Sequence, residues 1–281
     1  MIALTGATGF VGGRLLERLR SEGEEVRALS RNPKGDQVRA DVLEPDTLGP
    51  ALEGVDAAYY LVHAIGDPGS FDETEAEGAR NFARAAREAG VQRIVYLGGL
   101  AHGDDLSDHM RSRQEVGRLL AETGVDVVEL RASIVIGEGS LSWQLVRDLV
   151  DASPVLPLPD WIDTLCQPIA VDDLVEYLVA ARDAAPGVYE IGGADVVTYR
   201  ELIAAYGDAA GKGTVQVGVP VLASVPQLVT DLLPEQARAS LHLVESLRFD
   251  STVDDPAAAR AFEVAPTGVR EAIRRALAAP C

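Results

Sequence analysis

The chain has 281 residues, 47% of them hydrophobic, and a formal net charge of −19 at pH 7. This length suits one large α/β domain, alone or with a smaller companion, and the apolar fraction is enough for a sizeable core. The negative charge repels phosphate backbones and anionic lipid, so it argues against nucleic-acid binding and against peripheral membrane docking.

Cysteine and histidine spacing argues against a disulfide framework and against a metal site. Cys166 and Cys281 lie far apart, and the four histidines show neither HxH nor HxxxH spacing. The N-terminus is typical of a strand and lacks a basic leader with a cleavage site. Pro220 and Pro226 interrupt the longest uncharged run, residues 213–230, so we expect no transmembrane segment. These features favour a cytoplasmic protein with a small-molecule substrate; monomer and homo-oligomer both stay open.

Short β-branched runs alternate with segments of helical periodicity over the first 180 residues. In chain order, the pattern predicts strands at residues 1–5, 25–30, 55–62, 93–99 and 125–133, a short extra strand just before Asp41, and helices at 10–21, 70–89 and 108–123. Such alternation is typical of βαβ units. Right-handed crossovers then give a doubly wound parallel sheet with helices on both faces.

Beyond residue 140 this alternation loosens. The sequence there predicts a proline-rich loop at residues 152–161, a helix at 168–181, a strand at 187–193 and a further helix from residue 198. We expect Asp172 and Asp173 to act as charges near a helix N-terminus, and Thr198 with Glu201 to form a capping box. We therefore expect a single domain over residues 1–281, in which residues 140–281 contribute a small C-terminal lobe that binds substrate.

Three glycines directly follow the first predicted strand and open the first helix, in the sequence LTGATGFVGGRLL. This context predicts a dinucleotide-binding loop, although a glycine turn without a ligand is the alternative. Gly6 permits a tight turn, Gly9 lets backbone amides approach a pyrophosphate, and Gly12 allows the helix to pack closely on the strand. The helix N-terminus adds partial positive charge at the anion. The expected loop contacts are Gly6, Thr8, Gly9, Phe10, Val11 and Gly12.

The end of the second strand favours NADP over NAD. NAD enzymes of this plan usually end that strand with an acidic residue that holds the ribose 2′-hydroxyl. Here the strand ends with Ser30 and Arg31, and a guanidinium can hold a 2′-phosphate. An ordinary surface arginine is the alternative, and NAD stays possible. Asp41, followed by Val42, is a candidate acceptor for the adenine amino group or else a turn aspartate.

Five segments together carry a family likeness: TGATGFVGG, LSRNP, ADVLEP, YYLVHA and QPIAVDDL. They resemble the atypical short-chain dehydrogenase/reductases, in particular the NAD(P)-binding group that includes NmrA-like and bacterial YbjT-like proteins. The likeness covers residues 1–180 and weakens beyond them. It implies a Rossmann fold that binds NAD(P) along the carboxyl ends of its strands.

The resemblance also implies further cofactor contacts. The end of the strand at residues 55–62, with Leu61 and Val62, and His63 directly after it would pass the adenine ribose and pyrophosphate. His63 is alternatively a loop histidine bonded to backbone. Gly98 would lie beside the cofactor at the end of the next strand. The segment after residue 131 would run beside the nicotinamide, through Ala132, Ser133 and Ile134, although Ser133 is alternatively the cap of a turn.

Standard members of the family carry Tyr-x-x-x-Lys on the helix that follows the strand corresponding to residues 93–99, and a serine at the end of that strand. Neither lysine of this chain follows a tyrosine at that spacing, and Gly98 and Gly99 stand where the serine is expected. His109 and Arg113 occupy the tyrosine and lysine positions. His109 can exchange protons near neutral pH, and Arg113 can hydrogen-bond ribose hydroxyls. The alternative is that both only line the cofactor, or lie on the helix surface beside Arg111.

The aromatic residues indicate the core and the substrate pocket less clearly than the motifs above indicate the cofactor site. Tyr59 and Tyr60 are expected in the core. Trp143 and Trp161, together with residues 213–230, are candidate walls of a hydrophobic substrate pocket, with a core role as the alternative.

The favoured function is the NADPH-dependent reduction of a small apolar carbonyl or enone, because the cofactor carries the hydride chemistry and positioning matters more than any one side chain. One alternative is a non-catalytic NAD(P)-binding redox sensor or regulator, which the missing tyrosine, lysine and serine favour. Another is a non-redox isomerase or cyclase on the same fold.

Overall fold

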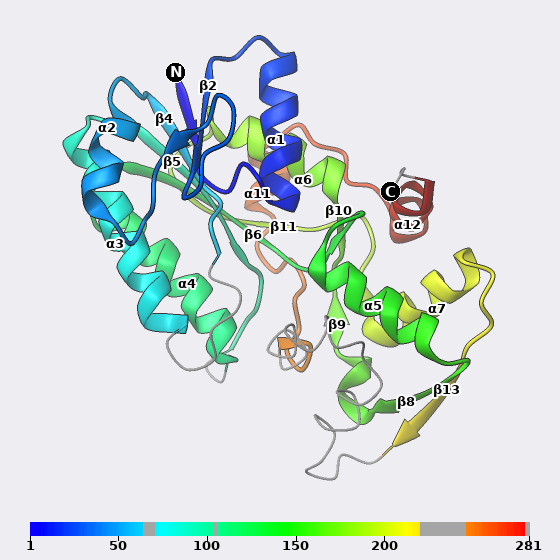
Figure 1. The fold of residues 1–281 in the computed structure, drawn as a ribbon. Coiled ribbons are helices and arrows are strands. Elements are labelled where there is room, and N and C mark those ends of the chain that lie inside the picture. Colours follow the sequence, from blue (N-terminus) through cyan, green and yellow to red (C-terminus); the bar gives the residue numbers. More distant parts are fainter. Residues whose placement is uncertain (64–70, 104–105, 220–245, 279–281) are drawn as a thin grey trace.

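A seven-stranded parallel sheet forms the centre of the computed structural model, which describes residues 1–63, 71–103, 106–219 and 246–278 (Figure 1). Its strand order is β11-β6-β5-β4-β1-β2-β3, and every pairing in it is parallel. The strands are β1 (Ile2–Leu4), β2 (Val26–Ser30), β3 (Val38–Arg39), β4 (Ala57–Tyr60), β5 (Arg93–Gly99), β6 (Asp126–Ala132) and β11 (Gly187–Ile191). The predicted α/β, Rossmann-type doubly wound sheet is confirmed.

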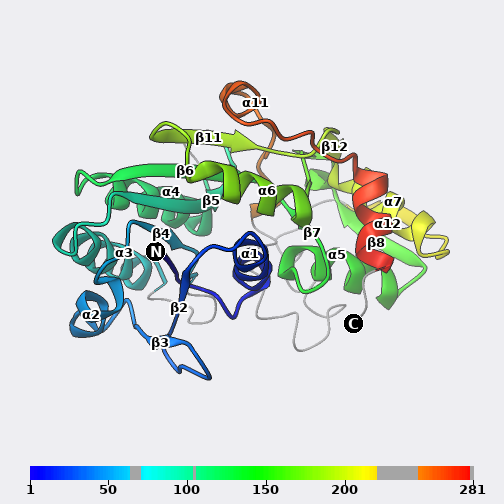
Figure 2. The same cartoon turned by 90° about the horizontal axis from the view of Figure 1, so that it is seen from above.

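Helices cover both faces of this sheet (Figures 1 and 2). One face carries α2 (Leu48–Leu52), α3 (Phe71–Glu88) and α4 (Asp108–Ala121), and the other carries α1 (Phe10–Ser21), α6 (Val171–Ala181) and α11 (Ala257–Ala261). Strands buried on both sides explain the continuous apolar runs, such as IAL in β1 and AAYY in β4.

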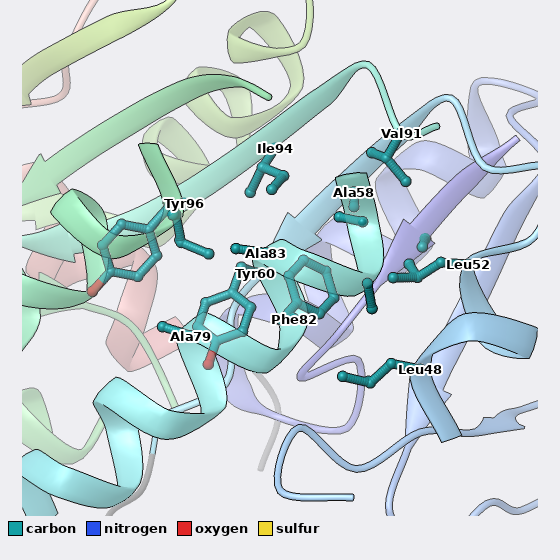
Figure 3. Packing of buried hydrophobic residues seen from close by; sticks show 14 of the residues in the cluster. Leu48, Leu52, Ala58, Tyr60, Ala79, Phe82, Ala83, Val91, Ile94 and Tyr96 are labelled. Atoms are coloured by element: carbon teal, nitrogen blue, oxygen red, sulfur yellow. The ribbon is translucent and has the colours of Figure 1, made fainter. Parts of the chain in front are cut away.

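Aromatic side chains fill the core between the sheet and α3. The rings of Tyr60 and Phe82 have centroids 5.0 Å apart, and Tyr60 and Tyr96 are 6.1 Å apart (Figure 3). Tyr59 points to the opposite face, where its buried hydroxyl donates to the carbonyl of Leu178 at 3.1 Å. The prediction that Tyr59 and Tyr60 are core residues is confirmed.

The chain changes direction across the sheet between β1 and β4. From β1 it proceeds to β2 and β3 on one side, and then returns to place β4 on the other side of β1. Open α/β sheets bind ligands outside the carboxyl ends of the strands at such a switch point. The glycine loop follows β1, and the segment from Leu61 to His63 follows β4, so both meet at this point.

A third hydrophobic cluster lies beside the sheet and is built from later elements. These are β7 (Val135–Ile136), α5 (Leu141–Ala152), β8 (Val155–Pro159), the 3₁₀ turn η2 (Asp160–Asp163), β9 (Leu165–Cys166), β10 (Ile169–Ala170), β12 (Val197–Thr198), α7 (Tyr199–Ala209) and α12 (Val269–Ala278). The strand β13 (Val215–Val219) pairs with β8 outside this cluster. A second 3₁₀ turn, η1 (Pro45–Thr47), precedes α2. In the part of the chain that is described, we find no helix with the length and apolarity needed to cross a bilayer.

Trp143 belongs to this third cluster, so the structure agrees with its alternative role in the core and not with a role as a pocket wall. Its side chain is 1% exposed and packs edge-on against Tyr206 at a centroid distance of 5.3 Å. It is drawn inward because α5 turns the face that bears Trp143 and Val146 toward α7. The side chain of Trp161 and residues 220–230 lie outside the described part of the chain.

The proline-rich stretch expected as a loop is a strand, β8, for half of its length. β8 pairs in parallel with β13, and Val215 N donates to the Pro154 carbonyl at 2.8 Å. Backbone hydrogen-bonding groups alternate sides along a strand, and with Pro154 bonded to β13 the backbone nitrogens of residues 157 and 159 face away from it. Their missing N–H groups therefore cost no ladder bond, as is typical of edge strands.

Two predictions about the N-terminal turns of later helices are confirmed. Thr198 and Glu201 form the expected capping box of α7. Asp172 and Asp173 both lie in the first turn of α6. Asp173 does more than complement the helix dipole, because its buried carboxylate accepts from the Thr267 N–H at 2.5 Å and from the Thr267 hydroxyl at 3.0 Å. It thereby attaches the segment before α12 to α6.

A substitution at Gly117 tests how closely α4 packs on the sheet. A Cβ at this position would collide with the carboxylate of Glu129 on β6, which is 3% exposed and paired with Arg131 at 2.7 Å. We expect Gly117→Ala to destabilise the protein by about 1–3 kcal/mol, despite its better helix propensity. Urea unfolding measures this change.

Gly49 is the matched control, because it is an exposed helical glycine with open space where a methyl group would lie. Gly49→Ala is expected to change stability by less than about 0.5 kcal/mol, because the gain in helix propensity is offset by the restriction that Pro50 places on the residue before it. Equal losses of stability in the two variants would contradict the close packing described at Gly117.

Candidate functional site

A cavity of about 1190 Å³ lies at the carboxyl edge of the sheet, around the switch point. Every residue expected at the cofactor or in catalysis lines it. These are Gly6, Thr8, Gly9, Phe10, Val11, Gly12, Ser30, Arg31, Asp41, Val42, Leu61, Val62, His63, Gly98, His109, Arg113, Ala132, Ser133 and Ile134. The structure therefore brings the set together; contact of these residues with a cofactor stays a prediction.

The glycine loop is shaped by backbone contacts that leave no room for side chains. Gly6 has a φ of +68°, and a Cβ on it would lie 2.6 Å from the carbonyl oxygen of Leu61. A Cβ on Gly12 would collide with the Gly6 carbonyl oxygen. Gly9 donates its N–H to Gly6 at 2.9 Å and precedes α1. The first amides of α1 lack intrahelical acceptors and face this cradle, so the loop fits a dinucleotide diphosphate.

Thr5 connects the two strand ends that border the switch point. Its hydroxyl donates to the Tyr59 carbonyl at 3.0 Å and accepts from the Leu61 N–H at 2.9 Å. The side chain is 3% exposed. Because β1 and β4 are joined in this way, the glycine loop and the Leu61–His63 segment are held at a set separation.

The adenosine end of the cavity, as expected from the resemblance, is lined by the residues after β2 and β3. Ser30 accepts from the Asn32 N–H at 3.2 Å, and the exposed side chains of Arg31 and Lys34 supply two cations. Asp41 accepts from the Leu43 N–H at 3.0 Å. Asp41 is therefore a turn aspartate, which was the alternative expectation for it, and it also lines the cavity.

A buried carboxylate lies against His63. His63 Nδ1 is 2.5 Å from Oε1 of Glu75 on α3, and the Ser112 hydroxyl of α4 donates to Oε2 at 2.6 Å. Burial by itself raises the pKa of Glu75, but the hydrogen bond and charge of His63, with the charge of Arg113 and the Ser112 hydroxyl, lower the pKa to about 2. Glu75 is therefore a carboxylate, and it forms a side-chain hydrogen bond with His63, for which a bond to backbone was the alternative.

His109 and Arg113 face the cavity from the first two turns of α4. Their neighbour Arg111 instead pairs with the exposed Asp108. Since these side chains diverge, the helix-surface alternative for His109 and Arg113 does not describe the structure. The ring of His109 lies against that of His63, with centroids 5.0 Å apart and a tilt of 57°.

Arg113 is held in place by β5. Its guanidinium donates to the Leu97 carbonyl and lies 5.1 Å from the centroid of the Tyr96 ring. The Tyr96 hydroxyl in turn donates to the backbone carbonyl of Arg113 at 2.8 Å. Burial raises the pKa of Tyr96 far above its ordinary value, so this phenol stays neutral and acts as a fixed donor. A guanidinium with five N–H groups still has donors to offer a ligand.

Hydroxyl groups line the far end of the cavity. Ser133 and Ser251 are joined by a 2.7 Å hydrogen bond, and Tyr199 lies 3.5 Å from Ser251. Ser107 and Ser246 form a similar pair at 2.9 Å. Leu100, Leu141 and Leu247 contribute apolar surface. Ser133 therefore bonds a side chain of the C-terminal segment and does not cap a turn.

Several site residues escaped the sequence analysis, namely Thr5, Lys34, Glu75, Ser112, Tyr199, Ser246 and Ser251. Glu75 and Ser112 carried a usable signal, because each is a polar residue on the mostly apolar buried face of its helix. Ser251 and Tyr199 meet only through tertiary contacts. Within the described ranges, no group of three or more histidine, cysteine or carboxylate side chains has the geometry to hold a metal ion.

Solved structures share this fold over nearly the whole chain. The NADPH-dependent quinone oxidoreductase QOR2 of Escherichia coli, solved with NADPH, superposes with a TM-score of 0.77 at 22% identity and covers 98% of this chain and 99% of its own. A nucleoside-diphosphate-sugar epimerase of Staphylococcus aureus gives a TM-score of 0.76 at 18% identity, with 97% and 99% covered. At these identities the likeness concerns the fold.

Curated relatives are matched over part of their length. An uncharacterised protein of Mycobacterium tuberculosis is 29% identical over 235 residues, which is 80% of this chain and 25% of the relative. The chain thus spans about a quarter of that protein. The ceramide reductase of Caulobacter vibrioides is 28% identical over 203 residues, or 68% of this chain and 64% of the relative.

Alanine substitutions at two adjacent glycines in α1 test the geometry of the glycine loop. Gly12→Ala should abolish dinucleotide binding, because its methyl group displaces the Gly6 carbonyl and deforms the cradle. Gly13→Ala should bind normally, because its Cβ would lie 3.6 Å from the nearest atom, the Ala7 carbonyl oxygen. Calorimetry with NADPH and NADH compares the two variants, and unimpaired binding by Gly12→Ala contradicts the assigned cradle.

The first half of the chain carries the match that decides its family. Residues 6–148, just over half of the chain, fit a family model described as NAD(P)H-binding. That range contains the glycine loop, the ends of β2, β4 and β5, and the helix that bears His109 and Arg113. The NAD(P)-binding assignment expected from the resemblance to atypical short-chain dehydrogenase/reductases is thereby confirmed. The chain belongs to the NAD(P)H-binding family.

Proposed function

We propose that this protein is an NADPH-dependent reductase of small apolar carbonyl compounds or enones. The observation that carries the proposal is the meeting, in one cavity, of the glycine cradle with His109 and Arg113, which stand at the positions of the family's tyrosine and lysine. The name of the ceramide reductase supports the same reaction class, and the quinone enzyme is named an NADPH-dependent oxidoreductase.

The preference for NADPH rests on charge at the end of β2. Arg31 and Lys34 both line the cavity there, and no acidic residue follows the strand until Asp36. Two cations favour a 2′-phosphate over a free 2′-hydroxyl, and the arginine can bind it through two parallel hydrogen bonds. NADH can occupy the same cradle with fewer contacts.

The substrate would bind in the lobe formed by residues 140–281, within a single domain over residues 1–281. The lobe's described contribution to the cavity is apolar surface with hydroxyl groups, from Leu141, Ser142, Tyr199, Leu247 and Ser251. Such a lining suits a neutral, largely apolar molecule that accepts a hydrogen bond.

The protein's own residues would supply positioning and a proton. Bound NADPH supplies a hydride to the carbonyl carbon, or to the β-carbon of an enone. Arg113, anchored on the Leu97 carbonyl, would hold the ribose hydroxyls. His109 would give a proton to the substrate oxygen as negative charge develops there, a role that histidine fills at neutral pH.

Coenzyme preference is tested at Arg31. We expect Arg31→Ala to raise the Kd of NADPH about 10- to 100-fold, because a charge-assisted pair of hydrogen bonds contributes about 1.5–3 kcal/mol. The Kd of NADH should stay unchanged. Calorimetry measures both constants, with Arg87→Ala on the exposed end of α3 as the control for loss of a surface cation. Equal weakening for both coenzymes would show that Arg31 does not read the 2′-phosphate.

The reaction itself is tested by NADPH oxidation with benzaldehyde, 2-cyclohexenone and 1,4-benzoquinone. We expect turnover with at least one of them, and a loss of about 100-fold or more in His109→Phe, typical of a removed general acid. His102→Phe is the control, because His102 bonds the Thr252 carbonyl at 2.8 Å and does not line the cavity.

Two outcomes of the same assay favour the alternative functions. Tight NADPH binding without turnover on the panel points to a redox sensor or regulator, the function that the absent tyrosine, lysine and serine favour. Product formed without net change in nicotinamide absorbance points to an isomerase or cyclase. Full activity of His109→Phe would remove His109 from the mechanism while leaving the reductase assignment intact.

A further inference from the structure

We propose that Glu75 and His63 form a carboxylate–imidazole pair that supplies protons to the site. In this pair Glu75 positions His63, and His63 exchanges protons with His109. This inference rests on the proposed function, since it assigns the source of the proton that His109 delivers.

Three elements build the pair. His63 follows β4, Glu75 lies near the start of α3, and Ser112 lies on α4. His63 Nδ1 is 2.5 Å from one carboxylate oxygen of Glu75, and the Ser112 hydroxyl is 2.6 Å from the other. With both oxygens bonded and its side chain 4% exposed, Glu75 is held in one orientation by two independent contacts.

The ionised state of Glu75 fixes the tautomer of His63. A carboxylate accepts hydrogen bonds and donates none, and the low pKa of Glu75 keeps it ionised at neutral pH. Nδ1 of His63 must therefore carry the proton. Nε2, on the other side of the ring, is then the nitrogen that gains and loses a proton, and the ring lines the cavity. The same logic orients imidazoles in other carboxylate–histidine pairs.

Among the described residues, other charged and titratable groups near His63 lie on α4, β4 and β5. Arg113 of α4 has a guanidinium nitrogen 3.5 Å from His63 Nδ1, and it opposes a second positive charge there. His109 of the same helix packs on the ring. Tyr60 of β4 and Tyr96 of β5 stay neutral, because burial raises the pKa of each. Glu75 is thus the anion that makes a protonated His63 tolerable beside Arg113.

Proton transfer from His63 to His109 is balanced. After His109 has given its proton to the substrate oxygen, the N–H bond at Nε2 of a protonated His63 breaks and an N–H bond forms on His109. His63 is left neutral, with Nδ1 still donating to Glu75. The His63 side chain is 20% exposed, so water at the cavity mouth can return the proton. No oxidant or reductant takes part in this step.

The wild-type protein provides the first test. Nitrogen-15 NMR of its histidines at neutral pH should show neutral His63 as the Nδ1–H tautomer, and this measurement needs neither substrate nor a variant. An Nε2–H tautomer would overturn the inference. NADPH calorimetry on the same sample tests the proposed function separately, so a failure of one is distinguishable from a failure of the other.

The second test uses Glu75→Gln, with Glu77→Gln as the matched control on an exposed position of the same helix. We expect Glu75→Gln to lower kcat about 100-fold while the KM for NADPH stays near that of wild type, and to alter the His63 nitrogen shifts. Glu77→Gln should change neither. A Glu75→Gln protein that binds NADPH and keeps wild-type kcat and His63 shifts would overturn the positioning role.

Discussion

The structure depends on a backbone approach that admits no side chain at Gly6 and Gly12. The Gly6 carbonyl lies against α1 at Gly12, and the Gly6 α-carbon lies against the Leu61 carbonyl. These contacts bring the end of β1, the start of α1 and the end of β4 to one point, and the Thr5 hydroxyl ties the two strand ends together. The diphosphate cradle and the His63 segment are therefore parts of one packed unit, and the cavity follows from it.

The site keeps the family's arrangement while its side chains differ. His109 and Arg113 occupy a helix face that, in the standard members, carries tyrosine and lysine. The lysine there supports the tyrosine by charge; here the carboxylate of Glu75 places an anion beside His63 and Arg113. In the proposed mechanism imidazole takes the place of phenol, and because imidazole becomes cationic when it is protonated, a neighbouring carboxylate stabilises its charged form.

The C-terminal elements close the cavity through hydroxyl contacts across long sequence separations. Ser133 follows β6 and bonds Ser251, which lies 118 residues later, and Ser107 bonds Ser246, 139 residues later. Asp173 secures the segment before α12 through Thr267. These polar ties set how the lobe meets the sheet, while the cluster around Trp143 gives the lobe its own core.

Local patterns in the sequence determined the strands of the sheet, the glycine loop, the capping box at Thr198 and the helix positions of His109 and Arg113. Such features depend on neighbours within one or two turns, so periodicity and spacing reveal them. The strand β8 reads as a loop in the sequence because its prolines are acceptable only on the free edge of a pair with β13, some 60 residues away. The inward burial of Trp143 and the pairings of Glu75 with His63 and Ser112 were decided by tertiary structure alone. Burial and charge pairing depend on which faces meet in space, and a single sequence does not specify those contacts.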